Sequence, residues 1–138
     1  MWKYEVSVNW ETEKIGKVGA AGKSNFQVAT PPEFGGPENQ WTPEDLLAAS
    51  VASCVMTSTL FFTKRSKIEM ESYQSQAVAV MEKTPAGLAI TSVRVLVSVR
   101  LKDSSQSEAM QKAVEMAEKN CPISASLNCS VKIELSIL

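Results

Sequence analysis

Two cysteines in different settings are the main candidates for chemistry in this chain. Cys54 lies in LLAASVASCVMTSTLFF, an uncharged run that predicts a buried helix. Cys121 ends one helical segment and precedes Pro122, which fits the start of a new short helix, a favourable place for a thiolate. The pair is a candidate for a peroxidatic and a resolving thiol, but spacing alone does not bring the two together.

Packing is the competing interpretation for each cysteine. Free cysteine is among the most often buried residue types, and burial raises the pKa of a thiol. A reactive Cys54 therefore needs a nearby cation, and the start of its own helix is too far away to act as one. Cys121 can equally be a plain helix stop. Cys129, which opens the last expected strand, is better explained by packing.

Glu44 and Lys17 are the charged residues that could serve a thiolate. Glu44 stands ten residues before Cys54, which is about 15 Å along a helix, so contact between them would have to cross a subunit interface. Acidic residues are also common in the first turn of any helix. Lys17 and Lys23 flank glycines near the N-terminus, where a solvated turn lysine is the simpler interpretation.

Composition excludes several other classes of site. The 138 residues include no histidine, which removes imidazole bases, most zinc sites and Cys-His pairs. The three cysteines form no CxxC motif, so we expect no metal and no cofactor. A net charge of −1 without a basic run argues against nucleic acid. We expect no signal peptide, no membrane span and a cytoplasmic protein, in which a disulfide would be transient.

The expected elements form a single α+β domain over residues 1–138. In chain order we expect two or three strands up to Ala29, an ordered loop, a long apolar helix Pro43–Arg65, a hairpin turning at Pro85–Gly87, an amphipathic helix in residues 103–120, a short helix at Pro122 and a last strand in residues 130–138. Strands that are not separated one by one by helices favour a mainly antiparallel arrangement, here a single six-stranded sheet. The long helix is apolar on most faces, so a second chain could cover it.

Three local details are also predicted. Tyr4, Val6, Val8 and Trp10 alternate along the first strand and should be half-buried on one face. Thr42 and Asp45 form a capping box at the start of the long helix. Ser105 and Glu108 should do the same for the amphipathic helix, whose apolar stripe is Met110, Ala113, Val114 and Ala117.

Two segments, EFGGPENQWTPEDLLAASVASC and AEKNCPISASLNCSVKIEL, resemble the OsmC/Ohr family of thiol peroxidases, and the order of elements agrees over essentially the whole chain. The resemblance implies an intertwined homodimer with two active sites at its interface, mainly antiparallel sheets around a long central helix, a peroxidatic Cys54 and a resolving Cys121. It also implies that Glu44 and an N-terminal arginine approach the cysteine of the other subunit. No arginine occurs in that part of this chain, and Lys17 in IGKVG is its nearest counterpart.

The resemblance implies a cysteine-based reductase of organic hydroperoxides. Cys54 would cleave the O–O bond, Cys121 would trap the sulfenate as a disulfide, and a dithiol or a lipoylated protein would reduce it. Trp41, Phe61 and Phe62 favour an apolar peroxide. One alternative is a non-catalytic OsmC-like binding or stress-related protein, because the arginine is missing and lysine lacks its bidentate fork. An acyl-binding or thioesterase-like domain is a weaker alternative that the absence of histidine disfavours.

Overall fold

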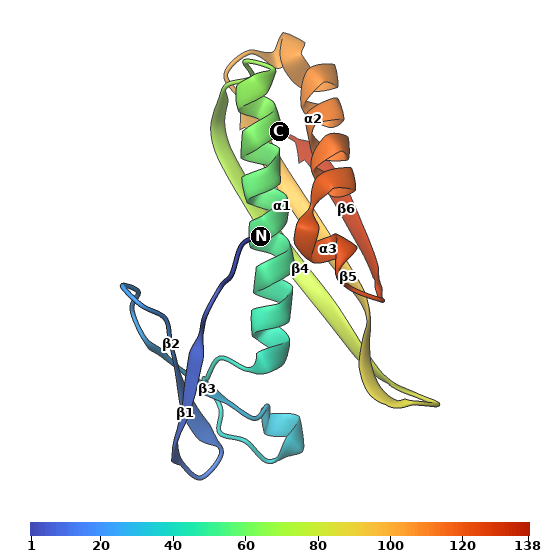
Figure 1. The fold of residues 1–138 in the computed structure, drawn as a ribbon. Coiled ribbons are helices and arrows are strands. Elements are labelled where there is room, and N and C mark those ends of the chain that lie inside the picture. Colours follow the sequence, from blue (N-terminus) through green and yellow to red (C-terminus); the bar gives the residue numbers. More distant parts are fainter. The chain divides into compact units, whose positions relative to one another are not determined.

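The computed structural model describes all residues from Met1 to Leu138 and has an α+β fold (Figure 1). Its elements are β1 (Ser7–Thr12), β2 (Ile15–Gly19), β3 (Phe26–Ala29), a 3-10 turn (Pro32–Phe34), α1 (Pro43–Arg65), β4 (Met70–Thr84), β5 (Gly87–Leu101), a 3-10 turn (Ser104–Gln106), α2 (Ser107–Asn120), α3 (Pro122–Ala125) and β6 (Ser130–Ile137). The chain divides into two compact units, Met1–Leu46 and Leu47–Leu138.

The N-terminal unit is a three-stranded antiparallel meander in the order β1-β2-β3, as the alternation predicts. The prediction of a half-buried face on the first strand is wrong for the chain alone. Val8 is 64% exposed and Trp10 is 77% exposed, because nothing else in the N-terminal unit covers that face of β1.

The loop that leads into α1 is ordered by its backbone. Gly36 lies so close to the Thr30 carbonyl that an added Cβ would be 1.6 Å from its oxygen, so only glycine fits there. The Ala29 N–H then donates to the Trp41 carbonyl at 2.8 Å and ties the end of the loop to β3. The loop therefore delivers the chain to α1 along a defined path.

The predicted capping box at the start of α1 is confirmed. The Thr42 hydroxyl accepts from the Asp45 N–H at 3.1 Å, and the Asp45 carboxylate accepts from the Thr42 N–H at 3.0 Å. The second predicted box is wrong, because the Asp103 carboxylate accepts from the Ser105 N–H and begins a 3-10 turn before α2. Ser105 thus lies within the turn rather than at the helix cap.

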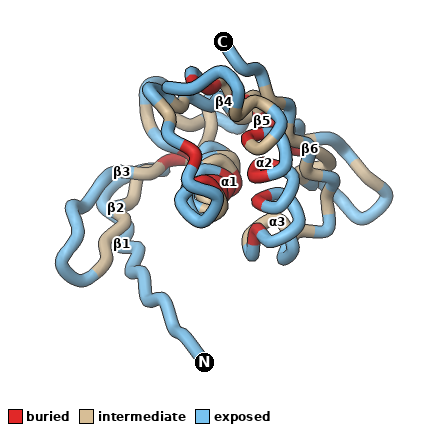
Figure 2. The backbone as a smooth tube through the Cα atoms, turned by 90° about the horizontal axis from the view of Figure 1, so that it is seen from above, coloured by how far each residue is buried: buried red, intermediate tan, exposed pale blue.

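The C-terminal unit is a three-stranded sheet with helices over one face (Figures 1 and 2). β4 and β5 form the predicted antiparallel hairpin, and β6 pairs with β5 in parallel. The prediction of one six-stranded sheet is wrong for this chain: its six strands form two separate three-stranded sheets, with no ladder joining them.

The core of this unit lies between the helices and β5, where Figure 2 shows the buried segments gathered. Alternate valines of β5 meet one stripe of α1 and the predicted stripe of α2. The fully buried members of these elements include Val51, Val55, Val93, Val95, Val97, Val99 and Met110. Only one stripe of α1 is buried, and Leu60 and Phe61 remain 43% and 60% exposed.

By length and composition alone, α1 is apolar enough to cross a membrane. The core helix of a water-soluble protein meets the same criterion, and α1 packs one stripe against the sheet of its own chain. The fold is that of a soluble protein.

Candidate active site

The structure brings Cys54 and Cys121 together. Cys54 lies in the middle of α1, whereas Cys121 joins α2 to α3; Cys121 belongs to the buried core, and Cys54 is partly buried and packs against that core. The two thiols are close enough to act on each other's pKa, since Cys121 raises the pKa of Cys54 and Cys54 lowers the pKa of Cys121. The sequence could not establish this contact, because it depends on how α2 packs beside α1.

The sulfur of Cys121 has the better environment for a thiolate. The Ser124 N–H and the Ser124 hydroxyl donate to it, at 3.4 Å and 3.2 Å. Burial opposes ionisation, but the hydrogen bonds from Cys54, Ser124 and the Ile123 N–H outweigh it and lower the pKa of Cys121. This residue is nevertheless only 1% exposed, so few molecules can approach it.

Cys54 has the opposite combination of access and acidity. Burial raises the pKa of the Cys54 thiol, and the neighbouring Cys121 raises it further, while Ile123 and Ser58 only partly offset them. The Cys54 side chain lines an open, mainly apolar cavity of about 450 Å³ with Phe61, Phe62 and Pro122. A small apolar molecule can therefore reach Cys54, but the chain by itself does not favour its thiolate.

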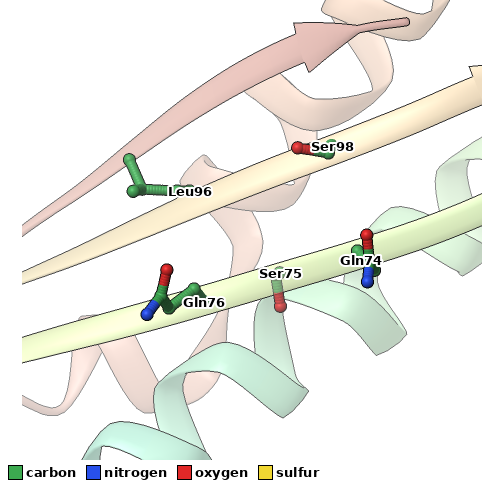
Figure 3. A pocket seen from close by; sticks show the side chains of 5 residues that line it. All are labelled: Gln74, Ser75, Gln76, Leu96 and Ser98. Carbon is green, nitrogen blue, oxygen red and sulfur yellow. The ribbon is translucent and has the colours of Figure 1, made fainter.

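The remaining candidates for a site are less suited to redox chemistry. Cys129 and Cys121 line a smaller cavity of about 220 Å³. A further hollow of about 300 Å³ lies over β4 and β5 and is lined by neutral side chains, Gln74, Ser75, Gln76, Leu96 and Ser98 (Figure 3). No three His, Cys, Asp or Glu side chains are grouped so that they could hold a metal ion.

Glu44 and Lys17 lie in the N-terminal unit. One carboxylate oxygen of Glu44, Oε2, is buried without a hydrogen-bond partner, which is costly unless a donor is supplied from elsewhere. The Lys17 ammonium lies 3.6 Å from the Glu11 carboxylate, and its side chain is 48% exposed. α1 contains both Glu44 and Cys54, which confirms that they are ten residues apart on one helix.

Sequence reasoning missed Ser124 as a member of the site. Its signal was available, because a residue three positions after Cys121 at the start of a helix can donate to the cap side chain. Two of the three apolar residues predicted near Cys54, Phe61 and Phe62, do line its cavity, with their rings edge to face and their centroids 5.1 Å apart. Trp41 does not line this cavity.

The family profile described as OsmC-like protein matches residues 36–136, which include both cysteines, Glu44 and all of α1. The chain belongs to the OsmC-like family. A curated relative of this OsmC-like chain is the uncharacterized protein YmaD of Bacillus subtilis (strain 168). The two are 25% identical over 137 residues, which cover 96% of this chain and 91% of the relative.

Solved structures share the fold of the OsmC-like chain. An OsmC-like protein of unknown function from Vibrio cholerae superposes with a TM-score of 0.91 at 21% identity, covering 99% of this chain and all of that one. An organic hydroperoxide resistance protein OsmC from Legionella pneumophila gives 0.73 at 24% identity, with 99% and 97% covered. The organic hydroperoxide resistance protein OhrB of Bacillus subtilis gives 0.68 at 24% identity, with 98% of each chain covered.

Proposed function

We propose that this OsmC-like chain is a thiol-dependent reductase of organic hydroperoxides that works in the cytoplasm. The observation that carries the proposal is the proximity of Cys54 and Cys121, with Cys54 open to an apolar cavity and Cys121 almost fully buried. The names of the Legionella and Bacillus proteins that share the fold point the same way.

The proposed reaction uses only the two thiols and an external dithiol. The Cys54 thiolate attacks one peroxide oxygen, the O–O bond breaks, and the other oxygen leaves with its electron pair and takes up a proton as the alcohol. Cys121 then attacks the Cys54 sulfenate, which expels water and forms a disulfide. A dithiol, free or carried on a lipoylated protein, reduces the disulfide by exchange. No metal or cofactor takes part.

The proposal includes a homodimer, because Cys54 needs a positive charge close by, and the cations of its own helix, Lys64 and Arg65, lie in the last turn, ten or more residues further on. In a dimer, Glu44 and Lys17 of one chain would serve Cys54 of the other. The unpartnered carboxylate oxygen of Glu44 supports this arrangement, since it can accept a further hydrogen bond. Lysine offers a charge but not the fork of an arginine, so we expect a slower enzyme than one with arginine there.

Thiol counting tests the proposed reaction. Reduced protein is treated with one equivalent of cumene hydroperoxide, and free thiols are measured together with the alcohol released. We expect two thiols lost per alcohol formed, and only one in Cys121→Ser, whose sulfenate can be trapped with dimedone. A chain that binds cumene hydroperoxide without forming alcohol would instead be a non-catalytic binding protein.

Lys17→Ala tests the replacement of the family arginine. If Lys17 is the cation, we expect the reaction of Cys54 with cumene hydroperoxide to slow by about tenfold at neutral pH, because about one pKa unit of thiolate stabilisation is lost. The matched control is Lys23→Ala, which removes an exposed lysine from a turn of the same unit and should change nothing. Equal rates in the two variants would show that Lys17 is not the cation.

A further inference from the structure

The Ser124 hydroxyl contacts the Cys121 sulfur and has no role in the reaction steps proposed above. It donates to the Cys121 sulfur at 3.2 Å, and the Ser124 N–H donates to the same sulfur at 3.4 Å. Both donors come from a half-buried residue, and the sulfur they hold is almost fully buried. Hydrogen bonds of this kind stabilise a charged acceptor more than a neutral one.

Donors of this kind matter most in the step that reduces the disulfide. In thiol–disulfide exchange, an attacking thiolate bonds to one sulfur while the other leaves with the electron pair, and a leaving thiol of lower pKa leaves faster. The two sulfurs of a Cys54–Cys121 disulfide differ in both access and leaving ability. Cys54 faces the cavity of about 450 Å³, whereas Cys121 carries the donors.

We propose that Ser124 makes Cys121 the leaving thiolate, so that the reductant always attacks Cys54 and forms its mixed disulfide there. The attacking thiolate enters beside Phe61 and Phe62, the Cys54–Cys121 bond breaks, and Cys121 departs as a thiolate held by Ser124. The second thiol of the reductant then attacks its own first sulfur and releases Cys54. This proposal gives Ser124 a catalytic role in the reductive half of the function proposed above.

The directions in which the two thiol pKa values shift in the reduced protein agree with attack at Cys54 and departure of Cys121. Burial opposes ionisation of Cys121, but its hydrogen bonds lower its pKa all the same, whereas burial raises the pKa of Cys54. The released Cys54 thiolate therefore takes up a proton more readily than the Cys121 thiolate does. The cavity beside Cys54 is also mainly apolar, which suits the hydrocarbon part of a dithiol.

The first test identifies the sulfur that is attacked. The disulfide is made in Cys129→Ser protein with diamide, without any peroxide, and is then treated with a large excess of 2-mercaptoethanol. The mixture is quenched in acid, free thiols are labelled with N-ethylmaleimide, and peptides are analysed by mass spectrometry. We expect the mercaptoethanol adduct on Cys54 and the label on Cys121. An adduct on Cys121, an even mixture of the two, or no disulfide after diamide treatment would overturn the proposal.

The second test isolates the hydroxyl of Ser124. The pKa of Cys121 is measured from thiolate absorbance at 240 nm in protein that carries Cys54→Ser and Cys129→Ser. We expect Ser124→Ala to raise it by about one unit and Ser124→Thr to restore it. The control is Ser126→Ala, because the Ser126 hydroxyl on the same turn donates to the Pro122 carbonyl at 2.7 Å and not to sulfur. Equal pKa values in Ser124→Ala and Ser126→Ala would refute the role.

These tests separate the inference from the function on which it rests. If cumene hydroperoxide fails to oxidise Cys54 while the diamide disulfide is still attacked at Cys54, the proposed peroxidase is wrong. The assignment of Cys54 as the attacked sulfur and Cys121 as the leaving thiolate then stands. If peroxide forms the disulfide but the adduct appears on Cys121, the peroxidase stands and the role of Ser124 is wrong.

Discussion

Replacing Cys54 with serine is expected to abolish hydroperoxide turnover, lowering the rate by about a thousandfold or more, because no other group in the site can take over the attack on oxygen. The measurement is consumption of cumene hydroperoxide with dithiothreitol as reductant. Cys129→Ser is the matched control, since it also removes one partly buried thiol, and it should keep the wild-type rate.

The assignment of the first attack to Cys54 rests on access outweighing acidity. The hydrogen bonds around Cys121 favour its thiolate, but that residue is only 1% exposed and does not line the apolar cavity beside Cys54. A raised pKa costs tenfold in thiolate for each unit, but a sulfur as buried as that of Cys121 meets peroxide far less often than the sulfur of Cys54 at its open cavity.

Cys121→Ser distinguishes the two assignments. It should still release one equivalent of alcohol in a first turnover and then stop, because the Cys54 sulfenate has no thiol to condense with. If Cys121→Ser abolishes even that first equivalent while Cys54→Ser retains it, the two roles are reversed.

Most local elements could be predicted from the sequence because their signals are local. Pro43, which follows the capping residue Thr42, fixes the start of α1. The alternating valines of β5 identify a strand with a buried face. The separation of the strands into two sheets carries no such signal. Pairing partners depend on long-range packing, and nothing in the residues of β3 and β4 says that they do not pair with each other.

The candidate site could be predicted only in part for the same reason. Cys54, Cys121 and the apolar residues Phe61 and Phe62 are visible in the sequence, but the proximity of the two sulfurs requires α2 to lie beside α1. The donors of Ser124 depend on the turn that follows Cys121. The alternation along β1 predicts a buried face but does not indicate which chain buries it, and that face is exposed here.

Exposed apolar residues on α1 and β1 predict that the protein associates with itself. On α1, Leu60 and Phe61 are 43% and 60% exposed, and on β1, Trp10 is 77% exposed. Large exposed apolar groups of this kind are typical of protein–protein interfaces. We therefore expect the protein to migrate as a dimer, with twice the chain mass of 15.0 kDa, in sedimentation experiments.

Leu60→Glu is expected to weaken this dimer by about a hundredfold or more, because a carboxylate buried without a partner in an apolar interface is strongly unfavourable. The resulting monomer should react slowly with peroxide. Burial and the adjacent Cys121 raise the pKa of Cys54 in the single chain, so its thiolate is scarce at neutral pH. The rate should instead keep rising as the pH passes the ordinary thiol value of about 8.5.

Stopped-flow rates against pH, measured together with the sedimentation mass, check this prediction. The control is Lys83→Gln near the tip of the β4–β5 hairpin, which makes the same change of −1 in net charge at an exposed polar position. It should remain a dimer and keep the wild-type pH profile. A Leu60→Glu monomer with the wild-type rate and profile would show that each chain activates its own Cys54, and the cation would then have to be sought within a single subunit.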